Sequence, residues 1–137
     1  MVKEIIHDPF MLSLKSAPAG KEDLPTAADL LDTLKANKEI CAGMAANMIG
    51  VQKCIIAIND GGNFKVMLNP HILKQSEPFE TKEGCLSLAG EPRACKRYKK
   101  IKLQWLNEKL QTRTQTFEGW SAQIIQHEID HCNGVLI

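Results

Sequence analysis

The stretch QHEIDHCNG, residues 126–134, contains two histidines four positions apart, with a glutamate directly after the first one. Residues four apart on an α-helix lie one above the other, so His127 and His131 can hold a single metal ion. Glu128 then lies beside that line, where it can reach a water molecule on the ion without being a ligand itself. The stretch therefore predicts a metal-binding helix near the end of the chain.

The residues around this motif are typical of a helix from about residue 120 to residue 133, with Gly134 as its C-terminal cap. Trp120 and Ile124 share one face of this helix with the two histidines. A second face carries three further apolar residues, namely Ile125, Ile129 and Cys132. Two apolar faces indicate a helix in the middle of the protein, where imidazoles without a partner would be costly. We therefore favour a metal site over two solvated histidines.

The third protein ligand of this site has several candidates. In zinc peptidases with the same spacing the third ligand lies downstream of the helix. Only residues 132–137 follow His131 in this sequence, and no side chain near the end of the helix faces the histidine pair. We therefore expect the ligand upstream, where His7, His71, several carboxylates and the cysteines are candidates. Spacing alone does not choose among them.

The rest of the chain predicts one more helix and a set of antiparallel strands. Residues 20–39 carry apolar side chains at helical spacing, preceded by acidic residues. Strands are expected in two hairpins, the first at 53–59 and 64–69 and the second at 98–106 and 110–117. Strands in a run with a helix at each end predict an α+β fold, with antiparallel sheets around the C-terminal helix. At this length, residues 1–137 are expected to form one domain.

Composition and charge argue against several classes of protein. The chain has 17 Lys and Arg against 16 Asp and Glu, which does not suggest a nucleic-acid or anionic-membrane surface. The basic run at residues 96–102 is interpreted as a solvated strand face. No segment approaches the ~20 apolar residues needed to span a bilayer, and the N-terminus lacks a signal-peptide core. We expect a cytoplasmic protein whose five cysteines are mostly buried, inert thiols.

Three segments together resemble the peptide deformylase family. EGCLS at residues 83–87 and QHEIDHCNGVL at 126–136 match two of its motifs, and CAGMAANMIG at 41–50 matches a Gly-rich third motif less closely. The motifs occur in the family's order, and the resemblance runs from about residue 4 to the end. It implies a metal held by three side chains, with water in the fourth position. These ligands would be Cys85, His127 and His131, and the open position is typical of a catalytic site.

The resemblance also implies a reaction, removal of the N-formyl group from the initiator methionine of new polypeptides. Glu128 is implied as the general base and acid, and the backbone N–H of Leu86 as a donor to the developing oxyanion. Arg97 matches an arginine that contacts the substrate backbone, although it equally suits a solvated charge in the basic run. The substrate peptide is expected to bind as an added β-strand. The residues that would pair with it are Ala42, Gly43 and Met44.

The metal and the partners follow from the same resemblance. Iron(II) is the implied ion, although ligation by one cysteine and two histidines suits zinc equally, and zinc or nickel can occupy the purified protein. A ferrous site would be sensitive to oxygen, because Cys85 could be oxidised. The implied partner is an N-formylmethionyl peptide. No membrane or direct nucleic-acid contact is expected, whereas the ribosome and a second copy of the chain are candidate partners.

The Gly-rich motif departs from the family at the position of a glutamine whose amide donates to the oxyanion. This chain has Met48 there, and a thioether cannot donate a hydrogen bond. Loss of one such donor typically lowers kcat by on the order of 10²–10³. Cys41 replaces the motif's first glycine, and Ala42 replaces a branched residue. Asn47 carries an amide, but on an extended chain it would face the opposite way.

These features leave three hypotheses. The first is an active deformylase with weakened or altered catalysis. The second is a metal-binding relative that serves as a binding module or acts on another acylated amine, and Met48 favours it. The third is a zinc peptidase of another class, which the missing downstream ligand disfavours.

Overall fold

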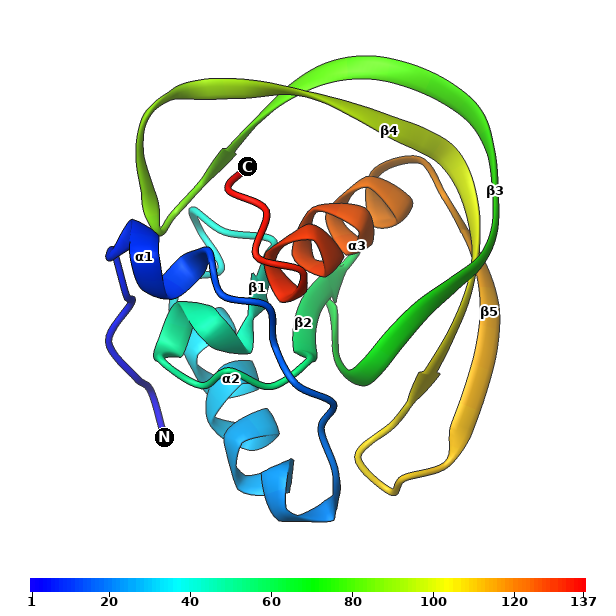
Figure 1. Ribbon diagram of the computed structural model, residues 1–137. Coiled ribbons are helices and arrows are strands. Elements are labelled where there is room, and N and C mark those ends of the chain that lie inside the picture. Colours follow the sequence, from blue (N-terminus) through cyan, green and yellow to red (C-terminus); the bar gives the residue numbers. More distant parts are fainter.

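A single antiparallel sheet curves around a central helix in the computed structural model, which describes the backbone of residues 1–137 and every side chain except that of Ala89 (Figure 1). Its strands are β1 (Gly43–Ala45), β2 (Ile55–Asp60), β3 (Asn63–Cys85), β4 (Leu88–Leu106) and β5 (Thr112–Glu118). They are hydrogen-bonded in sequence order, and every pairing is antiparallel. The predicted α+β architecture is confirmed, with one five-stranded sheet in place of several sheets.

The helical elements include the two helices that the sequence predicts. They are α1 (Pro9–Leu12), the 3-10 turn η1 (Lys21–Asp23), α2 (Leu24–Ala36), the 3-10 turn η2 (Ala46–Ile49) and α3 (Gly119–Cys132). In α2 a proline occupies the first turn, where no backbone N–H is needed. The helix buries Ala27, Leu30 and Leu34, three of the four residues at helical spacing. It is shorter than the predicted 20–39, because its first turn is a 3-10 turn.

Helix α3 ends as predicted but begins differently. Gly134 has φ +76°, and a Cβ there would lie 2.3 Å from the carbonyl oxygen of Ser13, so only glycine fits this cap. Trp120, expected on the buried apolar face, is 65% exposed. That expectation is wrong because α3 first becomes buried at Ala122, past its opening residues.

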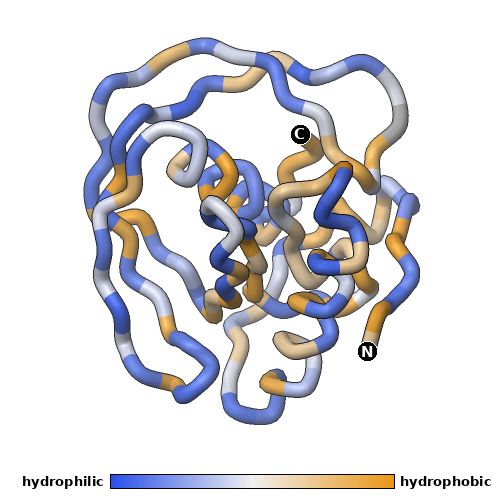
Figure 2. Tube along the Cα trace, turned by 180° about the vertical axis from the view of Figure 1, so that it is seen from behind, coloured by the Kyte–Doolittle hydropathy of each residue, from blue (hydrophilic) through white to orange (hydrophobic). Residues whose placement is uncertain are grey.

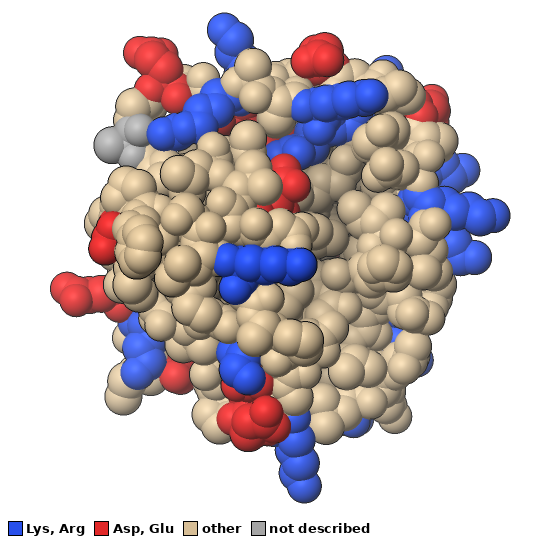
Figure 3. All heavy atoms as spheres, in the orientation of Figure 1, with Lys and Arg blue, Asp and Glu red and all other residues tan. Residues whose placement is uncertain are grey.

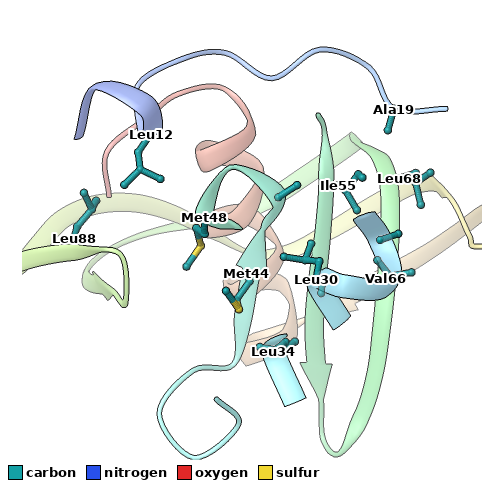
Figure 4. Close-up of a cluster of buried hydrophobic side chains, with 13 residues drawn as sticks. Leu12, Ala19, Leu30, Leu34, Met44, Met48, Ile55, Val66, Leu68 and Leu88 are labelled. Carbon is teal, nitrogen blue, oxygen red and sulfur yellow. The ribbon is translucent and has the colours of Figure 1, made fainter. Parts of the chain in front are cut away.

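The sheet is covered on both faces where the strands are shortest. Along β2, Ile55 and Ala57 pack into a cluster on the α2 side, whereas Ile56 and Ile58 pack into a cluster on the α3 side. Alternate side chains of a strand point to opposite faces, so this short apolar run is buried on both sides. Figure 4 shows the α2-side cluster, in which side chains of α2 meet those of β1, β2 and β3.

The first hairpin has the predicted turn. Gly61 and Gly62 have φ values of +61° and +96°, which two-residue hairpin turns of this type require. The second predicted hairpin is also present, with β4 joined to β5 through residues 107–111. On β4, Ile101 and Leu103 are fully buried, which confirms the alternation read from the sequence.

The long hairpin of β3 and β4 was not predicted. Between residues 71 and 84 the side chains of β3 are mostly exposed or half-buried, so they give no apolar period to read. Both strands arch over α3, and residues of both hydropathies follow one another along the arch (Figures 1 and 2). The hairpin ends where Cys85 pairs with Leu88. Its tip therefore carries the EGCLS segment to the metal-binding helix.

The distribution of charged side chains on the surface agrees with the balanced net charge of the chain. On the face shown in Figure 3, Lys and Arg side chains are spread over the surface with Asp and Glu among them. Within the described part of the chain, none of the helices has the length and apolar character required to traverse a bilayer.

Candidate metal centre

Three predicted ligands come together at the contact between the hairpin tip and α3. The ligand atoms of Cys85, His127 and His131 all lie within 4.8 Å of one another. The Nε2 atoms of the two histidines are 3.1 Å apart. The other histidines considered as ligands lie elsewhere, since His7 contacts the carbonyl of Ser87 and His71 pairs within the sheet. Among the described residues, no other group of three such side chains could hold an ion.

The donor set fits a transition-metal ion. One sulfur and two imidazole nitrogens suit zinc or iron(II), and three protein ligands leave a coordination position open. Both Nε2 atoms point to the same place, and Nδ1 of His131 is buried without a hydrogen-bond partner. Two neutral rings would not bring these nitrogens together without a proton or a cation between them. The arrangement is therefore that of a metal site.

Glu83 orients the first of these histidines. Its Oε1 lies 2.7 Å from Nδ1 of His127, so Nδ1–H donates to the carboxylate and Nε2 is left for the ion. Arg97 binds the same carboxylate through Nη2 at 2.8 Å, and Gln123 donates to Oε2 at 2.8 Å. Arg97 also reaches Asp130 of α3 at 2.7 Å. One buried network thus fixes the ring, the hairpin and the helix together.

The charges of this network shift the pKa values of its members. Burial alone would raise the pKa of Glu83, but hydrogen bonds from His127, Arg97 and Gln123 lower it to about 2. Burial lowers the pKa of His127, yet hydrogen bonds with Cys85 and Glu83 and nearby carboxylates raise it to about 10. Burial and then the charge on His127 lower the pKa of His131 to about 3. Without metal, His127 therefore carries a proton that a bound ion would displace.

A cavity of about 290 Å³ opens beside the ligands. Its lining includes Cys85, Leu86, His127 and Glu128, together with Ala42 and Gly43 from the Gly-rich segment. Glu128 is 4% exposed and its Oε1 has no hydrogen-bond partner. Burial is the main cause that raises its pKa, to about 7. A buried, unpartnered carboxylate at the edge of a cavity is suited to exchange protons with a bound molecule.

Gly43 allows β1 to approach α3 closely. A Cβ on Gly43 would lie 2.6 Å from Cγ2 of Ile124 and 3.0 Å from Oε2 of Glu128. Any larger residue would therefore push the strand away from the glutamate. β1 is also an edge strand, since it pairs only with β2 within the described sheet.

Two predicted substrate contacts lie outside the cavity lining. Arg97 is 4% exposed and is held between Glu83 and Asp130, because its pairing with Phe79 turns it to the inner face of the hairpin. Met44 is fully buried in the α2-side cluster. This geometry gives no support to direct contact between either side chain and a substrate.

The Gly-rich segment differs from expectation at Asn47. It lies in the 3-10 turn η2 and not on an extended chain. Its amide donates to the carbonyl of His131 at 2.9 Å, so it supports the metal-binding helix and faces away from the cavity. Met48 is 1% exposed and does line the cavity.

Comparisons with known proteins agree with this geometry. A family model described as polypeptide deformylase matches residues 4–137. The peptide deformylase of Clostridium beijerinckii is 47% identical over 137 residues, covering 100% of both chains. That of Aquifex aeolicus is 35% identical over 145 residues, covering 98% of this chain and 85% of its own.

Solved structures give the same result. The Met-Ala-Ser-bound class I type b peptide deformylase from Acinetobacter baumannii superposes with a TM-score of 0.87 at 28% identity, covering 99% of this chain and 97% of its own. The peptide deformylase from Thermotoga maritima gives a TM-score of 0.88 at 30% identity, covering 99% and 95%.

Replacement of Glu83 by glutamine tests the orienting network. We expect Glu83→Gln to lower zinc affinity about 10- to 100-fold, because the substitution weakens the hydrogen bond that fixes the His127 ring. Competition with a chromogenic chelator measures this affinity. Glu80→Gln, an exposed carboxylate on the same strand, is the matched control and should bind zinc like the parent. Equal affinities in all three proteins would show that the network does not orient the ligand.

Metal affinity should also depend on pH. The ion must displace the proton on His127, whose pKa is about 10 in the metal-free protein. Below that pKa, apparent zinc affinity is expected to rise at least about tenfold per pH unit. Competition titrations from pH 6 to pH 8.5, corrected for the chelator's own protonation, measure the slope. A flat profile would contradict a protonated His127 in the metal-free protein.

Proposed function

Because this chain belongs to the peptide deformylase family, we propose that it hydrolyses N-formylmethionyl peptides at the metal centre of Cys85, His127 and His131. The observation that carries the proposal is the convergence of this sulfur and two imidazoles beside the buried Glu128 and a cavity. The products are formate and a peptide with a free amino terminus.

The chain's own residues are proposed to move the proton. When bound, the ion supplies a Lewis acid and acidifies a water molecule. Glu128 accepts the proton of the attacking water on its free oxygen and later donates it to the leaving amine. A pKa of about 7 suits both directions of transfer near neutral pH. The backbone N–H of Leu86, next to Cys85, is the proposed donor to the developing oxyanion.

The substrate is proposed to bind as a strand along the open edge of β1. Ala42 and Gly43 line the cavity, and the strand's other edge is already paired with β2. Addition of a strand satisfies backbone groups on such an edge without requiring a particular side chain in the ligand. The proposed orientation puts the formyl end of the peptide next to Glu128 and the ligands.

Iron(II) is the ion we propose, with zinc or nickel able to occupy the same three ligands. Oxidation of Cys85 would then destroy the ferrous site in air. We propose that the protein acts on new polypeptides in the cytoplasm. The ribosome and a second copy of the chain are the proposed macromolecular partners.

A second candidate function rests on Met48. The residue lines the cavity where the family's glutamine would donate a hydrogen bond, and a thioether has no proton to donate. A protein with this site could bind metal and a peptide with little turnover, or act on another acylated amine. The same observation predicts weakened catalysis under the first proposal.

One assay separates these possibilities. We expect the iron-loaded protein to release formate from formyl-Met-Ala-Ser, and Glu128→Ala to abolish release. Met48→Gln restores a donor of similar length and should raise kcat, by up to about 10²–10³. Met48→Leu provides no donor and should fall short of the glutamine variant. Metal content of every variant is measured in parallel.

The opposite result is equally clear. If neither the parent nor Met48→Gln releases formate while both hold a full equivalent of iron, the binding-module function replaces the deformylase function. If Glu128→Ala retains the parent's turnover, the proposed proton transfer fails.

A further inference from the structure

The open edge of β1 carries two backbone groups that a docked strand would need. The N–H of Asn59 donates to the carbonyl of Ala42 at 2.8 Å, so that carbonyl faces β2. Successive residues of a strand direct their backbone groups to opposite sides. The carbonyl of Gly43 and the N–H of Ala45 therefore point away from β2, toward the open edge.

Both of these groups already have a partner from a side chain of the same segment. The thiol of Cys41 donates to the carbonyl of Gly43 at 2.9 Å. The sulfur of Met48 accepts from the N–H of Ala45 at 3.4 Å. These two partners, Cys41 and Met48, are also the residues at which the Gly-rich segment departs from its family's glycine and glutamine.

The thiol of Cys41 remains available as a hydrogen-bond donor. Burial, followed by the negative charge of Glu128, raises its pKa to about 12, so it keeps its proton at physiological pH. Cys41 also lines the cavity that contains Gly43 and Glu128. It therefore occupies the space through which a peptide would approach the edge.

We propose that Cys41 is a positioning residue that caps the edge of β1, so that a substrate peptide must displace its thiol from the Gly43 carbonyl before it can bind. The contact between Met48 and the Ala45 N–H is different, because Ala45 is fully buried at the start of η2 and does not line the cavity. This inference rests on the proposed function, because it requires a peptide on this edge. A thiol is a weak hydrogen-bond donor, so the Cys41 cap can be displaced.

The Cys41 cap acts on binding and not on the chemical step. Once the thiol has moved away, it no longer affects the bound peptide. The cap therefore raises KM and leaves kcat unchanged. A purely structural thiol predicts otherwise: its removal would leave a void and lower stability, with no gain in peptide affinity.

Two substitutions at one position separate these accounts. Cys41→Ala removes the donor, whereas Cys41→Ser keeps a hydroxyl that can donate to the Gly43 carbonyl. Calorimetry with zinc-loaded protein and the unformylated tripeptide Met-Ala-Ser measures binding without turnover. We expect Cys41→Ala to bind the tripeptide about 2- to 10-fold more tightly than the parent, and Cys41→Ser to remain close to the parent.

Steady-state kinetics with formyl-Met-Ala-Ser provide the second measurement. KM of Cys41→Ala should fall by a similar factor while kcat stays within about twofold of the parent. Unchanged or weaker tripeptide binding by Cys41→Ala, a serine variant that behaves like the alanine variant, or no tripeptide binding by any variant would overturn the cap. Tighter binding without formate release from any protein would support the cap and contradict the proposed chemistry. Normal formate release with unchanged tripeptide binding would support the proposed chemistry and contradict the cap.

Discussion

The buried carboxylate of Glu83 holds the long hairpin on the metal-binding helix. It binds His127 and Gln123 of α3 on one side and Arg97 of β4 on the other, and Arg97 returns to α3 through Asp130. Because Cys85 follows two residues after Glu83, the same contact carries the sulfur ligand to the two imidazoles. Such a network is stabilising only while every charge in it is paired, since removal of one partner leaves a buried charge uncompensated. The geometry of the centre thus depends on an interaction outside the ligand set.

The parts of the fold that could be predicted are those with a strong local signal. Helix α2 has apolar residues at helical spacing, and α3 is followed by Gly134, whose left-handed backbone only glycine suits there. The turn at Gly61 and Gly62 follows from the same conformational freedom. The arch of β3 and β4 has no such signal, because its exposed residues form neither a buried apolar face nor a turn. It is held by strand pairing and by the contact at its tip, both of which are long-range.

The site divides in a similar way. Spacing identifies His127, His131 and Glu128, because helix geometry relates them directly. Cys85 could be assigned only through the resemblance, since no local rule brings a hairpin tip to a helix about forty residues later. Glu83 was missed, although it lies only two residues before Cys85 in the EGCLS segment. Arg97 was assigned either to the substrate backbone, through the resemblance, or to a solvated basic run, yet it is buried between the carboxylates of Glu83 and Asp130. Polar partners inside a fold are set by tertiary contacts that sequence patterns do not contain.

Cys41, which we propose as a cap on the edge of β1, contacts the backbone of that strand and is not among the three candidate ligands. The central claim is the ligand set itself, and X-ray absorption at the zinc edge tests it most directly. We predict one sulfur at about 2.3 Å and two imidazole nitrogens at about 2.0–2.1 Å in the zinc-loaded protein, with the sulfur lost in Cys85→Ser. A shell without sulfur, or one that keeps its sulfur in Cys85→Ser, would contradict the account.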